Sequence, residues 1–231
     1  MSPTRFNPSA THPQSHPGGV FLAVLGPDGC GKSSVIDALV QELGNTFRGT
    51  RRFHFRPSLG RGDGPVVTDP YAAPPRSPAG SVAKLAYYWA DYVFGYLMRI
   101  RAGRQSELVV FDRYVHDIAA DPIRYRYGGP MWAVHALERL VPGPDLCLVL
   151  DAPAEVLQAR KQEVTLEQSR QQRDAYRRLA ERVPEAHLLD ASRPLDEVVE
   201  HARCLVLRQA ASGPRPALRR TRAVRASAER A

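Results

Sequence analysis

Eight consecutive residues near the start of the chain carry the strongest chemical signal. Residues 26–33 read Gly-Pro-Asp-Gly-Cys-Gly-Lys-Ser and fit the pattern G-x-x-x-x-G-K-[ST]. Glycines let the backbone aim successive N–H groups at phosphate oxygens, Lys32 reaches the outer phosphates, and the Ser33 hydroxyl ligates Mg²⁺. We therefore predict a phosphate-binding loop (P-loop) that holds ATP and Mg²⁺ through Gly26, Pro27, Asp28, Gly29, Cys30, Gly31, Lys32, Ser33 and Ser34.

A carboxylate follows an apolar run at two further places. Residues 109–114 read Val-Val-Phe-Asp-Arg-Tyr, so Asp112 ends a predicted strand and could hold Mg²⁺ through its water shell. Arg113 beside it could neutralise phosphate charge, although an Asp-Arg pair at a strand end can also be a plain ion pair. Asp151 follows Leu148, Val149 and Leu150 in the same way, and the strand pattern alone does not choose between the two aspartates.

A basic segment follows the second aspartate. It contains Arg160, Lys161, Arg170 and Arg173. Such a segment can close over ATP, exclude water and place cations on the transferring phosphate. The alternative is a solvated helix in which Glu167 and Arg170 pair at helical spacing.

These residues need a scaffold, and the apolar pattern supplies one. Strands are expected at 20–25, 52–55, 108–111, 146–150 and 186–189, with helices at 32–43, 82–101, 131–140, 154–163, 166–181 and 195–207. Alternating strands and helices predict an α/β fold with a parallel sheet, helices on both faces, and ligands at the carboxyl ends of the strands.

The positive charge lies mainly outside this scaffold. The chain has 231 residues and a net charge of +8, and the segment 212–231 holds six arginines against one glutamate. We predict a disordered head (1–19), one P-loop domain (20–211) and a disordered Arg-rich tail (212–231) that alone could tether nucleic acid. No apolar run reaches membrane-spanning length, no secretory signal is visible, and three scattered cysteines suit a reducing cytoplasm.

Together these segments resemble the thymidylate kinase family. The likeness rests on residues 26–34, on Asp112-Arg113-Tyr114, and on Leu150-Asp151 with the following Glu155 and Arg160-Lys161. It implies a P-loop NTPase fold with a five-stranded parallel sheet in the order 2-3-1-4-5 and a small lid. It also implies that Asp112 serves the metal, that Asp151 is structural, and that the catalytic set is Lys32, Asp112, Arg113 and Arg160.

The resemblance is weaker where the phosphate acceptor would bind. Asp28 matches the carboxylate that the family aims at a sugar 3′-hydroxyl, and Arg56 resembles its acceptor-phosphate arginine. Tyr92, however, stands where a base-reading arginine is expected, and Ser58-Leu59-Gly60 replaces the usual run after Arg56. Tyr88 and Tyr92, on one helical face with Lys84 and Asp91, could stack on an acceptor ring, or could be core aromatics.

The expected activity is ATP- and Mg²⁺-dependent phosphoryl transfer to a nucleoside monophosphate, dTMP by default. Another small acceptor (a nucleoside, sugar or metabolite phosphate) is the alternative, and a non-catalytic nucleotide-binding switch is the second one. The expected partner is the small-molecule acceptor, with no membrane contact and with a homodimer left open. The expected acceptor-site residues are Asp28, Arg56, Tyr88, Tyr92 and Arg113.

Overall fold

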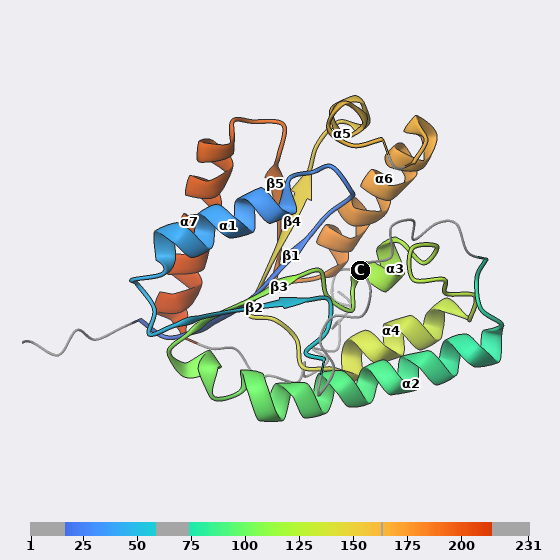
Figure 1. Ribbon diagram of the computed structural model, residues 1–231, viewed down its shortest axis with the longest axis horizontal. Helices are drawn as coiled ribbons and strands as arrows, with labels where there is room; N and C mark the ends of the chain where they lie inside the picture. The colour runs from blue at the N-terminus through green and yellow to red at the C-terminus, as the bar shows by residue number, and fades with distance from the viewer. Residues whose placement is uncertain (1–16, 59–73, 163, 214–231) are drawn as a thin grey trace, which may run out of the picture.

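The computed structural model describes residues 17–58, 74–162 and 164–213 (Figure 1). Residues 1–16, most of the predicted head, and 214–231, nearly all of the predicted tail, lie outside the described residues. So does much of the Pro/Gly-rich stretch between the second strand and the long helix, at 59–73.

A single parallel sheet forms the centre of the molecule. Its strands are β1 (Val20–Leu25), β2 (Thr50–His54), β3 (Leu108–Asp112), β4 (Leu146–Asp151) and β5 (Ala186–Asp190). They lie in the order β2-β3-β1-β4-β5, and every neighbouring pair is parallel. The mixed α/β class with a five-stranded parallel sheet is therefore confirmed. β1 is buried along its whole length, as its unbroken apolar sequence predicts.

Helices cover both faces of the sheet (Figure 1). One face packs against α1 (Lys32–Leu43), α5 (Ala154–Arg160) and α7 (Leu195–Ser212), which share an apolar cluster with the strands. The other face packs against α2 (Pro78–Gly95), α3 (Asp117–Ala120), α4 (Met131–Leu140) and α6 (Leu166–Arg182). A π-helical turn at Tyr96–Ile100 and a 3₁₀ turn at Gly103–Gln105 then lead into β3.

Several elements differ from the sequence prediction. β2 begins at Thr50 rather than Arg52 and stops before Phe55, whose φ of 58° is incompatible with a strand. α2 begins at Pro78, with the Ser77 hydroxyl accepting from the Gly80 N–H as an N-cap. α3 is absent from the prediction because a single helical turn has too few residues to show a period.

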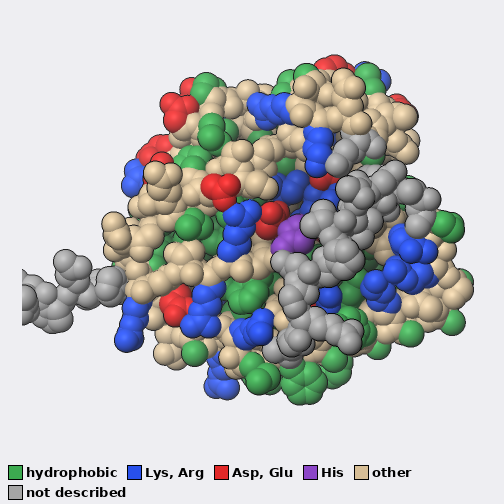
Figure 2. Space-filling view, viewed as in Figure 1, with side chains coloured by type: hydrophobic (Ala, Val, Ile, Leu, Met, Phe, Trp, Pro, Cys, Tyr) green, Lys and Arg blue, Asp and Glu red, His purple; other side chains and the backbone are tan. Residues whose placement is uncertain are grey.

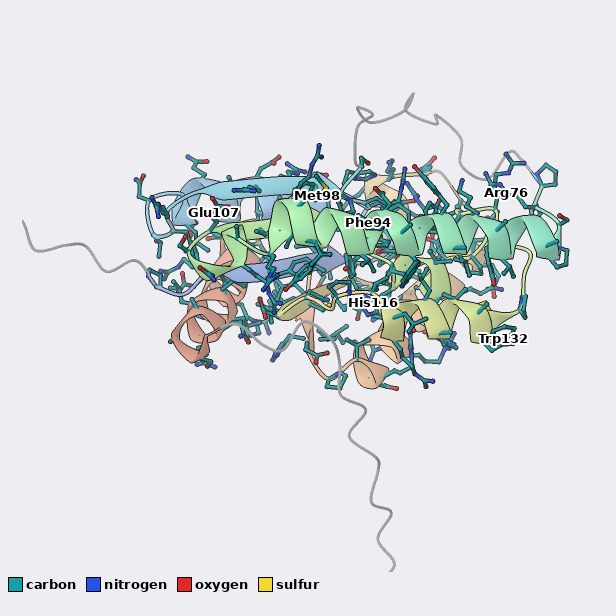
Figure 3. The ribbon with its side chains drawn as sticks, turned by 90° about the horizontal axis from the view of Figure 1, so that it is seen from below. Arg76, Phe94, Met98, Glu107, His116 and Trp132 are labelled. Carbon is teal, nitrogen blue, oxygen red and sulfur yellow. The ribbon has the colours of Figure 1, made fainter. Side chains whose placement is uncertain are left out.

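Large apolar side chains also remain on the outside. Phe94 and Met98 project from the α2 region and Trp132 from α4 (Figure 3), with 54, 75 and 69 % of their surface exposed. None of the helices in the described ranges combines the length and apolarity needed to cross a bilayer.

Candidate functional site

The loop between β1 and α1 has the backbone that the glycine pattern predicts. Gly26, Gly29 and Gly31 have φ values of 146°, 82° and 86°. A Cβ at Gly26 would lie 2.7 Å from the Leu150 carbonyl oxygen, whereas one at Gly31 would meet nothing within 4 Å. The glycines therefore serve both close packing against β4 and an open side on which a ligand can approach the backbone.

The Lys32 side chain binds the backbone of this loop. Its side chain is buried, and Nζ donates to the carbonyl oxygens of Gly26 (2.9 Å) and Pro27 (2.8 Å). Burial lowers the pKa of Lys32, against the opposing effects of Cys30 and Asp28. Ser33 is exposed in the first turn of α1, and Gly31 offers that helix no side-chain cap, so the N-terminal N–H groups can receive an anion.

Asp112 lies beside the loop because β3 neighbours β1. Asp112 is in register with Val24, and the next N–H, from Arg113, donates to the Val24 carbonyl (3.0 Å). Nη2 of Arg52 lies 3.4 Å and Nδ1 of His54 3.8 Å from the Asp112 carboxylate. Burial raises the pKa of Asp112, but the interaction with His54, together with the charges of Lys32 and Arg113, outweighs it and holds the pKa below its ordinary value.

Asp151 is committed elsewhere. Its two carboxylate oxygens accept from Nε and Nη2 of Arg173, at 2.7 and 3.0 Å, and Arg177 adds a contact of 3.1 Å. These contacts attach α6 to the end of β4, which fits the structural role that the family resemblance implies for Asp151.

Asp28 is held by two arginines. Its carboxylate forms ion pairs with Arg113 and with Arg124, and Asp28 and Arg113 are both nearly buried. Burial raises the pKa of Asp28, yet the two guanidinium groups outweigh it and lower the pKa below its ordinary value. Arg113 adopts a φ of 74°, a conformation that costs energy for a side chain of its size.

Arg124 was not among the predicted site residues. The sequence indicates only that the segment 124–129, of alternating arginine and tyrosine followed by two glycines, could line the acceptor mouth or be a surface loop, and it gives no distance to the loop at 26–33. The fold brings it there from 96 positions away along the chain.

A buried carboxylate connects this cluster to α6. Asp117 accepts hydrogen bonds from Nη1 of Arg113 (3.3 Å), from the hydroxyl of Tyr176 and from the backbone N–H of Tyr114 (2.8 Å). The carboxylate is fully buried. A movement of α6 would therefore alter the hydrogen bonds that position Arg113, next to the loop at 26–33.

The basic segment places Lys161, rather than Arg160, against the loop. Nη1 of Arg160 donates to the Ala191 carbonyl (2.9 Å), at the end of β5. A Cβ added at Gly29 would lie 3.4 Å from the Cβ of Lys161, so Lys161 is next to the loop. The charge of Lys161 also contributes to the low pKa of Asp28. Arg160, which belongs to the predicted catalytic set, is thus bonded at the end of β5, and Lys161 is the residue of this segment that lies against the loop.

Arg56 lies on the α2 side and is largely occupied. Nη1 pairs with Asp91 (2.8 Å) and reaches the Tyr87 hydroxyl (3.3 Å). The guanidinium carbon also lies 5.3 Å and 5.1 Å from the ring centres of Tyr87 and Tyr88. Burial lowers the pKa of Arg56, but the hydrogen bond to Tyr87 and the charge of Asp91 raise it overall.

The two predicted acceptor tyrosines differ in exposure. Tyr88 packs beside Arg56 and has 7 % of its surface exposed, whereas Tyr92 has 1 % exposed. The Tyr92 hydroxyl donates to the Phe55 carbonyl, and its ring packs 4.8 Å from that of Tyr114. Tyr92 is therefore a buried packing residue between Phe55 and Tyr114 rather than a residue that faces an acceptor.

Acidic, basic and histidine side chains meet at the centre of the face shown in Figure 2. Within the described ranges, His, Cys, Asp and Glu side chains nowhere gather in threes as a metal site. No protein-family model matches the chain, and no curated protein matches it significantly.

Proposed function

We propose that this chain is an ATP- and Mg²⁺-dependent phosphotransferase, similar to the thymidylate kinases, that transfers the terminal phosphate of ATP to a small acceptor. One observation carries the proposal: an open, three-glycine loop with a buried lysine lies between the central strand and a helix, beside the Asp112 carboxylate of the next strand. Under this proposal the chain is a P-loop kinase domain in the strand order 2-3-1-4-5, and the α5–α6 segment is its lid.

The residues present fit a bound nucleotide with its metal. The loop N–H groups and Lys32 would hold the phosphates, and exposed Ser33 and ionised Asp112 would hold Mg²⁺ directly or through water. A single carboxylate and a hydroxyl suit Mg²⁺, which keeps several waters and takes phosphate oxygens as further ligands. Mg–ATP supplies the transferable phosphate and a good leaving group.

The remaining residues act on the acceptor and the transferring phosphate. Asp28 would accept a hydrogen bond from the sugar hydroxyl of the acceptor and so orient the acceptor. For a nucleoside monophosphate, an oxygen of the acceptor phosphate would bond to the terminal phosphorus while the bond from that phosphorus to the ADP oxygen breaks, which gives ADP and a nucleoside diphosphate. Arg113, held by Asp117, would stabilise the charge on the equatorial oxygens.

The acceptor is dTMP by family default, but the position of Tyr92 favours a different one. The hydroxyl of Tyr92 is bonded to a backbone carbonyl and its surface is buried, so it cannot replace the donors of a base-reading arginine. We therefore propose that dTMP is used weakly or unselectively and that another phosphorylated acceptor is used better.

An ADP-release screen tests both statements. The full chain is assayed with Mg–ATP against dTMP, dUMP, dCMP, dGMP, nucleosides and sugar phosphates, with Mg²⁺ omitted as a control. We expect acceptor- and Mg²⁺-dependent ADP release, with a flat or shifted profile across the nucleotides. ATP binding without release on any acceptor would instead indicate a non-catalytic nucleotide-binding switch, and an exclusive preference for dTMP would refute the role given to Tyr92.

A further inference from the structure

Three cations lie together on the acceptor side, next to Arg56. Arg76, Lys84 and Arg126 line a small cavity with Tyr88 and Tyr125. Nζ of Lys84 lies 5.4 Å from the ring centre of Tyr88, whose other side faces Arg56. Figure 2 shows basic side chains gathered at the right of the view, near the loop after α3, with no acidic side chain between them, and Figure 3 places Arg76 at the start of α2.

Backbone carbonyl groups hold the two arginines of the cluster in place. Nη1 of Arg76 donates to the Tyr125 carbonyl (3.0 Å), and Nε of Arg126 donates to the Pro74 carbonyl (3.0 Å). The Arg76 N–H also donates to the Arg126 carbonyl (2.9 Å), which fastens the two segments together. A Cβ at Gly128 would overlap the Arg76 carbonyl oxygen, so this close approach needs a glycine.

Backbone strain and repulsion between like charges indicate that surrounding contacts hold this cluster together. Arg126 has a φ of 52°, which is costly for a long side chain and persists only where surrounding contacts impose it. Within the described part of the chain, Arg76, Lys84 and Arg126 form no ion pair with an acid. Burial and then the charges of Arg76, Arg56 and Arg126 lower the pKa of Lys84, so the cations repel one another.

The cluster is connected to the P-loop by one short segment. Arg124 binds Asp28 in the loop, and Arg126 lines the cavity two residues later, in the turn at 122–126. Tyr125 lies between them with its ring stacked on Phe55 at 4.6 Å. Its hydroxyl is buried and has no hydrogen-bond partner among the residues that the structure describes, which suits a polar ligand passing between the two positions.

We propose that Arg76, Lys84 and Arg126 bind the phosphate group of the acceptor, in place of Arg56. Arg56 already has a carboxylate partner in Asp91, whereas none of the three cations pairs with an acid among residues 17–58, 74–162 and 164–213. An oxyanion would relieve their mutual repulsion and gain charge-assisted hydrogen bonds. The acceptor is then a phosphate monoester with a free hydroxyl directed at Asp28, an assignment that rests on the proposed phosphotransfer.

Binding of inorganic phosphate tests the cluster without turnover. The full chain is saturated with Mg²⁺ and the non-hydrolysable analogue AMPPNP, which fills the P-loop, and phosphate is titrated by calorimetry. We expect at least tenfold weaker phosphate binding in Lys84→Gln/Arg126→Asn, in which asparagine tolerates the positive φ of residue 126. Arg56→Gln should stay within about twofold of wild type, and so should Lys84→Arg, which keeps the charge.

A matched control separates the site from general charge loss. Arg101→Gln/Arg139→Gln removes the same charge from exposed positions outside the cluster and should leave phosphate binding unchanged. Equal binding by the cluster variant and this control would overturn the proposal. So would loss of binding in Arg56→Gln with none in the cluster variant.

Competition then identifies the source of the phosphate. Ribose 5-phosphate or dTMP should displace inorganic phosphate, whereas ribose and thymidine should not. If free phosphate binds but neither ester competes, the cluster is a free-phosphate site and the acceptor assignment is refuted. Failure of AMPPNP to bind would contradict the proposed function instead, and the same phosphate titration without nucleotide would still test the cluster.

Discussion

Asp28 is a carboxylate within the three-glycine loop that we propose binds phosphate. Such a group would repel phosphate unless cations neutralise it, and Arg113 and Arg124 do so from opposite ends of the carboxylate. The same two guanidinium groups keep Asp28 ionised, as a hydrogen-bond acceptor for a hydroxyl must be. The loop would therefore present the Asp28 carboxylate, in a fixed orientation, beside the N–H groups that we propose bind phosphate.

This arrangement predicts a pH dependence for Asp28→Asn. The pKa of Asp28 is lowered below its unfolded value of 3.8, so the ionised carboxylate stabilises the fold fully above that pH and loses its effect as the pH falls through the folded-state pKa. At pH 7 we expect Asp28→Asn to be less stable than wild type by about 1–3 kcal/mol, because two arginines lose a charged acceptor. Thermal melts should show this gap closing below about pH 4. A gap of constant size down to pH 2 would contradict it.

Among single residues, those in a contiguous motif can be recognised from the sequence, whereas those that come into contact only through the fold cannot. Gly26 to Ser33 and Asp112 are recognisable because a motif or a strand end marks them. Arg124 and Tyr176 are not, because their roles depend on loops and helices that approach the P-loop only in the folded chain. Lys161 differs by one position from the predicted Arg160, a shift that helix boundaries alone cannot resolve.

Among the elements, β1 has to stay fixed because it carries the P-loop at its end. Asp145, just before β4, accepts from the Phe21 N–H (2.9 Å) and from Nε of Arg104 (3.0 Å). Asp145 is fully buried and Arg104 nearly so, and Nη1 of Arg104 also reaches the Tyr96 hydroxyl (3.0 Å). One ion pair thus joins the beginnings of two strands to the turn that precedes a third.

Removing the charge of Asp145 should cost stability without touching the P-loop. Asp145→Asn leaves the Arg104 guanidinium buried without its counter-ion, which costs about 3–5 kcal/mol and lowers Tm by roughly 10 °C. The exposed control Asp174→Asn should change stability by less than about 0.5 kcal/mol. Well below Tm the nucleotide affinity of Asp145→Asn should match wild type. An unchanged Tm would show that this pair does not anchor the sheet.

The elements themselves were largely predictable. β1 and α1 have the predicted bounds because an unbroken apolar run and a glycine-delimited helical period are both strong signals. β2 was shifted because it is an edge strand in which Arg51 and Arg52 reach solvent, so its apolar pattern is interrupted. The early end of α5 at Arg160 had no marker such as glycine or proline in the sequence.

For the whole molecule, the parallel sheet places every candidate residue at one edge. The carboxyl ends of β1, β3 and β4 lead to the P-loop, to Asp112 and to Asp151, while the α2 side contributes Arg56 and the cation cluster. The net charge of +8 belongs mostly to residues 212–231.

The most direct test of the central claim is the effect of Lys32→Ala on Mg–ATP-dependent ADP release, using the best acceptor from the screen. Losing one preorganised charge should lower kcat by about 10²–10³-fold. Because the Nζ contacts of Lys32 are to carbonyls of its own loop, the variant should keep its fold, which circular dichroism and a thermal melt would verify. A well-folded Lys32→Ala protein that releases ADP at the wild-type rate would contradict the account.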